Sequence, residues 1–245
     1  MTKQGVFRVE QNNVLAKSVY IMKLRGDTGA ISAPGQFVNI ALPGRYLRRP
    51  ISVCNVEGDL LTLVYKTVGG GTGQMSRIKA GEELDLLTGL GNGYDLAKSG
   101  KHPALLAGGV GAPPLYLLAK RLLEGGKSPA VVLGFRTKEE VFLESEFRAL
   151  GCKVYITTED GSAGTAGRVT DALPLCGDYD YSFACGPEAM LRAVYDQSGV
   201  DGQYSFERRM GCGFGACMGC SMETKNGPAR VCRDGPVFEK EVILW

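Results

Sequence analysis

Hydrophobic residues recur with two different rhythms along the 245-residue chain. In the first hundred residues, short apolar and β-branched runs alternate with clusters of Gly, Pro and Asp. This pattern is typical of antiparallel strands joined by tight turns, and it predicts a small barrel or sandwich over residues 1–98. The runs with strand character are residues 14–25, 36–42, 51–56, 60–66 and 83–90.

A second rhythm begins near residue 101, where apolar runs of strand length alternate with amphipathic stretches of helix length. Such alternation predicts a Rossmann-like parallel sheet with helices on its faces, which we expect to cover residues 99–203. Beyond about residue 200 the periodicity stops, and only residues 236–244 again have strand character. The predicted strands are residues 103–108, 130–135, 153–158 and 181–185, and the predicted helices are residues 113–126, 142–150, 167–173 and 187–197.

Composition and charge narrow the class of protein. Hydrophobic residues make up 44% and charged residues 22% of the chain, which is ordinary for a globular protein. The formal net charge is only +2, so nucleic acid is not expected as the main partner. The N-terminus lacks the apolar core of a secretion signal, and Gly and Pro pairs interrupt the longest weakly polar stretch, residues 103–119. We therefore expect no membrane span and a cytoplasmic location.

The chain has eight cysteines and a single histidine, His102. In a reducing compartment disulfides are rare, so clustered thiols favour metal binding. One histidine gives little basis for a Ser-His-Asp hydrolase or a His-rich zinc enzyme. We interpret Cys54, Cys152 and Cys176 as structural.

Four of the cysteines share the glycine-rich segment of residues 204–245. Their spacing is C-x4-C-x2-C, then eleven residues, then C, which is the plant-type [2Fe-2S] order. The small residues between them let backbone amides approach the sulfurs. A zinc knuckle is the alternative, although such sites usually pair two C-x2-C units and only one is present here. The predicted metal ligands are Cys212, Cys217, Cys220 and Cys232.

Three loops are candidates for a nucleotide site, because they follow predicted strands whose carboxyl ends meet at one edge of the sheet. The first is glycine-rich and precedes a helix, although it lacks the last glycine of a full dinucleotide fingerprint and could be a plain tight turn. The second carries two carboxylates, which favour NAD over NADP because they repel a 2′-phosphate. The candidate residues are Gly108, Gly109 and Gly111, then Glu159 and Asp160, and finally Cys185, Gly186 and Pro187.

Two stretches of the strand-rich region, residues 47–53 and 64–73, are candidates for a flavin site. Arg49 offers a planar guanidinium for a pyrophosphate, and Gly71 and Thr72 offer amides and a hydroxyl. Ser52 could bond a flavin ring atom. The alternative is two core strands followed by an ordinary glycine turn.

In this order, "RPIS", "VYK" with "GT", "GGVGAPP", "CGP" and the four-cysteine loop resemble the ferredoxin reductase-like flavoproteins, most closely the electron transfer subunits of dihydroorotate dehydrogenases. The resemblance covers essentially the whole chain. It implies FAD on an N-terminal barrel, NAD on the second domain, a [2Fe-2S] cluster near the C-terminus and a partner catalytic subunit carrying FMN, with two copies of each subunit. The FAD contacts it implies are Arg49, Pro50, Ile51, Ser52, Val64, Tyr65, Lys66, Gly71 and Thr72.

Within this family, electrons from dihydroorotate pass from FMN through the cluster to FAD and then to NAD, in pyrimidine (UMP) biosynthesis. FAD links the steps because a flavin handles both one and two electrons. We expect no essential general base in this chain. Two other functions remain open: a small subunit of an NADH/ferredoxin transhydrogenase or hydrogenase complex, and a zinc-stapled nucleotide-sensing module. Four cysteines at the cluster positions disfavour the transhydrogenase type, in which a carboxylate is expected at one position.

Overall fold

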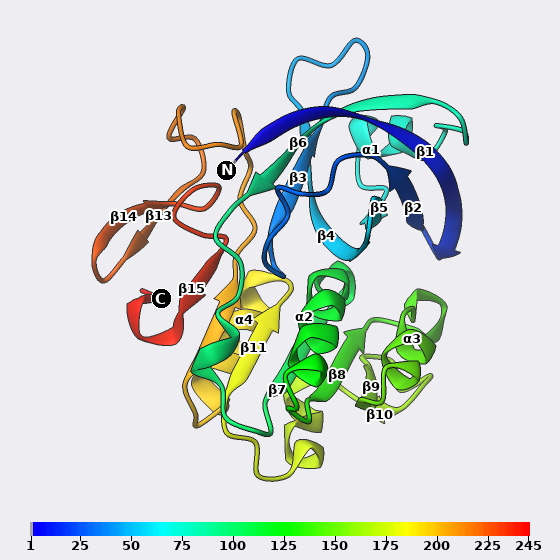
Figure 1. The fold of residues 1–245 in the computed structure, drawn as a ribbon. Coiled ribbons are helices and arrows are strands. Elements are labelled where there is room, and N and C mark those ends of the chain that lie inside the picture. Colours follow the sequence, from blue (N-terminus) through cyan, green and yellow to red (C-terminus); the bar gives the residue numbers. More distant parts are fainter. Residues whose placement is uncertain (1) are drawn as a thin grey trace.

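Six antiparallel strands close into a barrel, which forms the upper part of the molecule in Figure 1. The computed structural model describes residues 2–245. Closure follows from the order β1-β2-β5-β4-β3-β6, in which β1 pairs with both β2 and β6. Alternate side chains of each strand fill the interior, as Val38 and Ile40 do. The elements of this part are β1 (Lys3–Ala16), β2 (Val19–Arg25), β3 (Phe37–Ile40), β4 (Arg49–Glu57), β5 (Leu60–Lys66), α1 (Gly70–Met75) and β6 (Glu83–Leu90).

A seven-stranded sheet forms the second part, with the order β10-β9-β8-β7-β11-β12-β15. All of its neighbouring strands are parallel except β15, which runs antiparallel to β12. The fold is therefore the predicted combination of an antiparallel barrel and an α/β sheet. The sheet strands are β7 (Ala104–Gly108), β8 (Ala130–Phe135), β9 (Lys153–Thr158), β10 (Thr165–Ala166), β11 (Ser182–Cys185), β12 (Gly202–Ser205) and β15 (Val237–Glu239).

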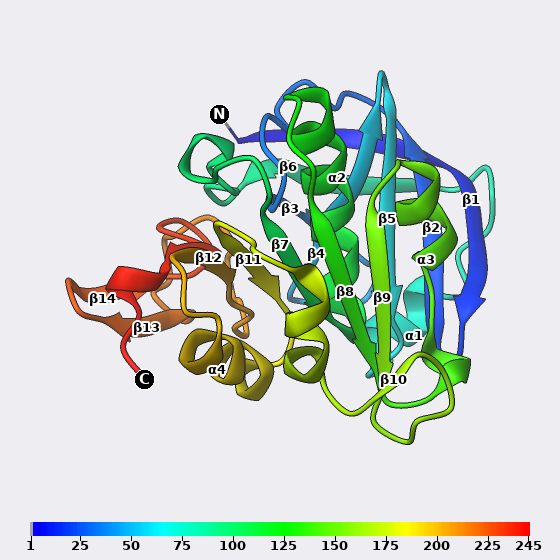
Figure 2. The same ribbon diagram turned by 90° about the horizontal axis from the view of Figure 1, so that it is seen from below.

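Helices cover both faces of the sheet (Figure 2). Helices α2 (Ala112–Glu124) and α3 (Glu144–Ala149) bury apolar residues on one face. The other face is covered by α4 (Glu188–Gln197) and the 3-10 helix η4 (Val169–Cys176). Four shorter 3-10 helices are η1 (Leu96–Lys98), η2 (Gly109–Gly111), η3 (Lys138–Glu140) and η5 (Lys240–Val242).

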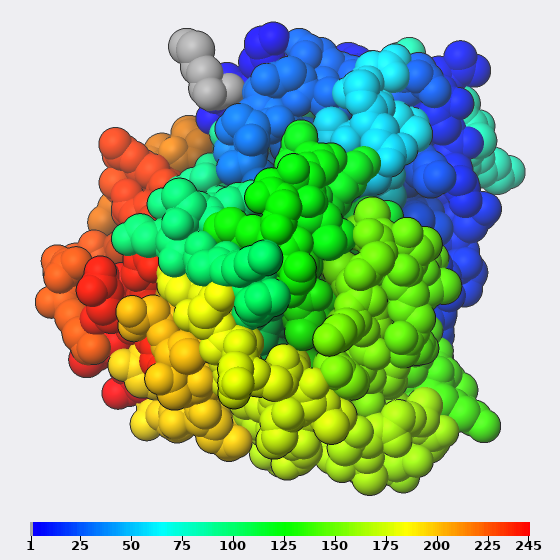
Figure 3. All heavy atoms as spheres, turned by 60° about the horizontal axis from the view of Figure 1, so that its bottom comes forward, coloured from blue at the N-terminus to red at the C-terminus, as the bar shows by residue number. Residues whose placement is uncertain are grey.

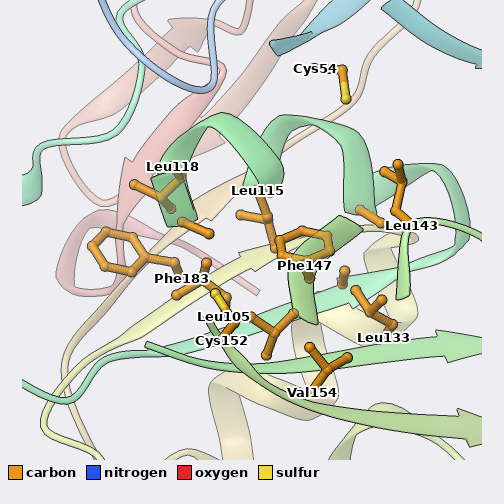
Figure 4. Close-up of a cluster of buried hydrophobic side chains, with 14 of the residues drawn as sticks. Cys54, Leu105, Leu115, Leu118, Leu133, Leu143, Phe147, Cys152, Val154 and Phe183 are labelled. Atoms are coloured by element: carbon orange, nitrogen blue, oxygen red, sulfur yellow. The ribbon is translucent and has the colours of Figure 1, made fainter. Parts of the chain in front are cut away.

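Helix α2 lies between the sheet and the barrel, and it packs on both (Figures 1 and 3). Leu115 and Leu118 face the sheet, whereas Leu117 joins the barrel core. Cys54 of β4 belongs to the same buried cluster as Leu115 and Phe147 (Figure 4). The apolar core is therefore continuous between the two parts, and their relative position is fixed by burial of these side chains.

The C-terminal segment is anchored at both of its ends. A hairpin of β13 (Ser221–Thr224) and β14 (Gly227–Arg230) carries the loop before it, and β15 extends the sheet beside β12. The segment packs on one face of the sheet, where its Met222 and Ile243 belong to the same buried cluster as Leu106 and Val132. In Figure 1 its orange loop lies next to the barrel, beside β3 and the N-terminus. This segment therefore touches both larger parts of the protein.

Three details differ from the pattern-based expectations. Residues 14–25 contain a hairpin turn, not one strand, because Lys17 and Ser18 separate β1 from β2 and Ser18 takes a positive φ of 60°. Residues 167–173 form part of a 3-10 helix, in which Pro174 cannot donate a helical hydrogen bond. The strand expected at 236–244 is limited to β15, since its partner β12 is itself only four residues long.

Strand β12 was not expected from the sequence pattern. Its residues Gly202 and Gln203 carry no apolar alternation, but Gln203 is buried and hydrogen-bonded to Glu239 and to the backbone of Asp95.

In the described part of the chain, no helix combines the length and apolar character needed to cross a bilayer.

Leu115 tests the continuity of the core. Leu115→Ala should lower the free energy of unfolding by about 2–5 kcal/mol, because the side chain is fully buried where sheet and barrel meet. Chemical denaturation of the cofactor-loaded chain measures the change. Leu175→Ala is the matched control, since Leu175 is exposed and should change stability by less than about 0.5 kcal/mol. Equal losses for the two variants would contradict the assignment of α2 to a shared core.

Candidate functional site: a cysteine loop beside a flavin-type barrel

The four cysteines come together as two pairs of thiols. Backbone amides of Cys212 and Cys217 each point to the sulfur of the other, with N to Sγ distances of 3.4 Å in both directions. The Cys232 amide lies 3.4 Å from the Cys220 sulfur. Within residues 2–245, no three His, Cys, Asp or Glu side chains converge on one position for a single ion. Two separate pairs match the division of ligands in a [2Fe-2S] core, in which each iron takes two thiolates.

Backbone amides stabilise negative charge on the first pair. Burial acts to raise the pKa of Cys212, but amides of Phe214, Cys217 and Ala216 outweigh it and lower the pKa to about 6. Burial raises the pKa of Cys232 to about 12, with a further contribution from its hydrogen bond with Cys220. A metal ion deprotonates coordinating thiols directly, so both pairs can act as thiolate ligands when a cluster is bound.

The loop owes its shape to two glycines at positive φ. Gly213 and Gly215 have φ values of 79° and 91°, and both are packed too closely for a side chain. A Cβ at Gly213 would overlap the side-chain amide of Asn39, and one at Gly215 would lie 2.7 Å from Arg233. Arg230 adds a hydrogen bond of 2.8 Å to the Gly215 carbonyl. These glycines therefore let the side chains of Asn39 and Arg233 pack directly on the loop.

Asn39 connects the barrel to the cysteine loop. It lies on β3, its Nδ2 donates a 3.1 Å hydrogen bond to the carbonyl oxygen of Cys212, and its residue is only 1% exposed. Its Oδ1 is buried and has no hydrogen-bond partner among residues 2–245. Sequence reasoning missed this residue. The available signal was a lone polar residue within the otherwise apolar strand "FVNI".

The two predicted flavin strands, β4 and β5, do not pair with each other along the residues predicted to contact the flavin. Residues Arg49–Ser52 of β4 pair with β3, and β4 meets β5 only from the pair Val53 and Leu63 onward. On the other side, residues 64–66 of β5 pair with β2 alone. The facing edges of β4 and β5 thus have backbone groups outside the sheet hydrogen bonds, which suits a planar ring with polar edges.

Arg49 lies against the glycine turn of α1. A Cβ at Gly71 would overlap the guanidinium Nε of Arg49, so a side chain at this position would displace the guanidinium. The Thr72 hydroxyl accepts hydrogen bonds from the amides of Val68 and Gly69, at 2.9 and 3.2 Å. Thr72 therefore fixes the shape of this turn next to a cation. A guanidinium beside bare glycine fits a pyrophosphate.

The side chains of two predicted flavin residues, Tyr65 and Lys66, make contacts within the protein. The Tyr65 ring is buried in the barrel, stacks on Tyr20 at 5.7 Å and donates its hydroxyl to Asn12 at 2.8 Å. Burial raises the pKa of Tyr65 to about 12. Lys66 forms an ion pair of 3.2 Å with Glu140 of the α/β part. A flavin would therefore meet the backbone of Tyr65, since its ring faces the barrel interior.

The remaining predicted flavin residues lie on the same two strands. Pro50, Ile51 and Ser52 of β4 are half-buried, and Ile51 packs against the barrel core. Val64 is buried where the barrel meets the α/β sheet. The structure thus places all nine predicted flavin residues on β4, β5 and the start of α1.

Two glycine loops of the α/β part pack against each other. A Cβ at Gly111 would overlap the carbonyl oxygen of Cys185, and one at Gly108 would lie 2.9 Å from Pro187. Gly109 takes a positive φ of 51° between them. Helix α2 starts directly behind this loop. The first and third nucleotide loops therefore form one surface at the carboxyl edge of the sheet, with backbone amides close to it.

Cys185 lies at the end of β11 next to Tyr94 and Ser205. Burial raises the pKa of its thiol to about 12, so the thiol is neutral at physiological pH. The Tyr94 hydroxyl donates to the carbonyl of the preceding residue, Ala184, at 3.1 Å. Cys185 is thus a neutral group at the surface formed by the glycine loops.

Glu159 and Asp160 follow β9 at the same edge and are exposed. Hydrogen bonds from the hydroxyl and amide of Ser162 hold the Asp160 carboxylate and lower its pKa. Asp160 therefore shapes its own loop. In residues 2–245, Glu159 has no ion-pair partner within 4.0 Å, which leaves its carboxylate available to a ligand.

Comparison with known proteins identifies the C-terminal part first. A family described as the iron-sulfur cluster binding domain of dihydroorotate dehydrogenase B matches residues 207–244. Among solved structures, one from a study of flavin-based electron bifurcation by an NADH-dependent reduced ferredoxin-NADP oxidoreductase is similar over 98% of this chain and 90% of its own, with 30% identity and a TM-score of 0.89. Phthalate dioxygenase reductase shares the fold at 22% identity and a TM-score of 0.65, over 80% of this chain and 64% of its own.

Full-length relatives agree with this match. The electron transfer subunit of dihydroorotate dehydrogenase B (NAD(+)) from Fusobacterium nucleatum is 43% identical over 94% of both chains. The subunit of the same name from Bacillus mycoides is 42% identical over the whole of both chains. The chain therefore belongs to the family of dihydroorotate dehydrogenase B electron transfer subunits.

Proposed function

We propose that this chain carries electrons between the FMN of a dihydroorotate-oxidising catalytic subunit and NAD, using a [2Fe-2S] cluster and FAD, in UMP biosynthesis. The observation that carries the proposal is 42–43% identity with subunits of this name along nearly the full length. The arrangement of the site supports it, because the paired thiols lie beside a barrel with a flavin-type opening.

Each cofactor has a fitting set of residues. Cys212 and Cys217 would hold one iron and Cys220 and Cys232 the other, as their pairing indicates. Arg49 and the turn at Gly71 and Thr72 would bind the FAD pyrophosphate, and β4 and β5 would hold the ring between their open edges. The glycine loops at Gly108–Gly111 and Cys185–Pro187 would bind NAD, with Glu159 at the ribose. The cofactors supply the redox chemistry, and the chain supplies their position and surroundings.

The catalytic partner would dock on the cysteine loop. Phe214 and Met218 on this loop are 52% and 54% exposed, and such side chains gain from being covered. Two copies of each subunit would form the complex, in the cytoplasm. The divisions at residues 98 and 203 stay predictions, and β15 shows that the last segment contributes a strand to the central sheet.

A second function is favoured by one observation, the 0.89 TM-score to the NADH-dependent ferredoxin-NADP oxidoreductase structure. Such an enzyme shares the fold and cofactor types but uses a different partner. The two functions therefore differ in which protein exchanges electrons with the cysteine loop, and the choice of partner separates them.

Partner addition tests the proposal. The chain alone, loaded with FAD and cluster, should reduce a dye with NADH but form no orotate, because its residues are already used by a barrel, a sheet and a cysteine segment. Adding the FMN subunit should restore dihydroorotate-dependent NAD reduction. Phe214→Ser should raise the FMN-subunit concentration needed, whereas Leu175→Ser, exposed on the distant η4, should not.

Dihydroorotate oxidation by the chain alone would refute the proposed division of labour. No response to the FMN subunit, with dye reduction intact and ferredoxin accepted instead, would favour the transhydrogenase function.

Glu159 should set the choice of pyridine nucleotide. The wild-type chain should prefer NADH to NADPH in dye reduction, because a carboxylate repels the 2′-phosphate. Glu159→Gln should reduce the ratio of the two kcat/KM values by about tenfold, equivalent to ~1.4 kcal/mol. Glu10→Gln, on the barrel and paired with Arg25, serves as the control and should leave the ratio unchanged. An unchanged ratio in Glu159→Gln would place the ribose elsewhere.

A further inference from the structure

Asn39 occupies a position between the two redox sites. In the β3–β4 pair it lies opposite Pro50, so its backbone is next to the strand that carries Arg49 and Ser52. Its side chain turns away from the barrel interior and donates to the carbonyl of Cys212. One residue thus contacts both the flavin-type strand and a cluster ligand that is 173 positions away in sequence.

The surroundings of Asn39 hold it in one orientation. Arg48 donates to the Asn39 carbonyl at 3.3 Å and to the Asp85 carboxylate at 2.7 Å, which fixes the backbone at this point. Gly213 packs on the side-chain amide so closely that a Cβ there would overlap it. The carbonyl of Cys212 needs a donor, and therefore the amide nitrogen must face the loop.

This orientation has a cost that an apolar residue would avoid. With Nδ2 directed to Cys212, the Oδ1 atom is buried with no hydrogen-bond partner. An unpaired buried acceptor opposes folding, and a leucine of similar size would remove it. The side chain is consequently better explained by its contact with the cysteine loop than by stability of the barrel.

We infer that Asn39 is a positioning residue that holds the Cys212 loop against the flavin strand and raises the reduction potential of the cluster. A donor on the Cys212 carbonyl draws electron density from the peptide that follows the ligand, and hydrogen bonding around cluster ligands is one of the protein's means of setting potential. The inference rests on the proposed cluster and extends it to a residue outside the cysteine segment.

Asn39→Leu removes the donor with an apolar residue, and Asn39→Asp, in its ionised form, replaces it with an acceptor of the same shape. The intact chain, purified without oxygen and loaded with FAD and cluster, is titrated by EPR, and its visible circular dichroism is recorded. Both variants should lower the reduction potential of the cluster by ~59 mV. For a one-electron couple this is about a tenfold decrease in the equilibrium constant for reduction of the cluster. The dichroism of the cluster should change as well.

Asn55→Leu is the matched control. Asn55 is also buried on the barrel, donates its Nδ2 to Glu57 at 3.1 Å and leaves its Oδ1 without a partner, but its hydrogen bond stays within β4. Its substitution should leave the potential and the dichroism as in the wild type. A shift equal to that of the Asn39 variants would show a general effect of the barrel and would overturn the inference.

The other possible results of these measurements also support or refute the role proposed for Asn39. Unchanged potential and dichroism in both Asn39 variants, with iron retained, would refute the inference. If Asn39→Leu does not fold, Asn39→Asp decides alone, and loss of iron with FAD retained would support a role in holding the loop. Loss of both FAD and iron in Asn39→Asp would show that Asn39 acts only in folding of the barrel, and it would refute the inference. Wild-type chain with zinc and no iron would instead reject the proposed cluster itself.

Discussion

Helix α2 buries apolar side chains toward two neighbours at once, and the relative position of the candidate nucleotide sites depends on this packing. Leu115 and Leu118 pack on the sheet, and Leu117 enters the barrel core. Because protein interiors are close-packed, the barrel and the sheet cannot slide past each other without opening voids. The start of the same helix follows the glycine loop of the nucleotide site. A single helix therefore fixes the distance between the flavin strands and that loop.

The cysteine segment shares the apolar core on one face of the sheet and takes its position from its neighbours. Strand β15 ties it to the sheet, and Asn39 ties its loop to the barrel. Arg208 adds an ion pair of 2.6 Å to Glu188 of α4. Since electron transfer depends on distance and surroundings more than on acid-base groups, these attachments are the main contribution of the chain to the reaction.

Local patterns in the sequence predict much of this arrangement. The spacing of Cys212, Cys217, Cys220 and Cys232 is such a pattern, and so are the strand periods and the glycines before α2. Ser18 shows a limit, because it forms a hairpin turn at positive φ without the usual Gly or Asn.

Contacts between segments that are far apart in sequence cannot be predicted from such local patterns. The bond from Asn39 to Cys212 and the overlap that forbids a side chain at Gly111 exist only once the chain has folded. Pairing of β12 with β15 also joins residues far apart in sequence, and Gln203 gives no apolar signal. The position of the cysteine loop beside β3 and β4 was therefore beyond sequence reasoning, whereas the spacing of its cysteines is a local pattern.

The central claim is that the cysteine loop and the flavin-type barrel form one electron path within this chain. Anaerobic addition of NADH to the isolated chain, followed by rapid freezing and EPR, tests it most directly. We expect bleaching of FAD to be accompanied by the signal of a reduced [2Fe-2S] cluster, without any partner subunit. A fully bleached flavin beside a cluster that stays oxidised, at a potential where a mediator dye reduces it, would show that the two sites do not exchange electrons.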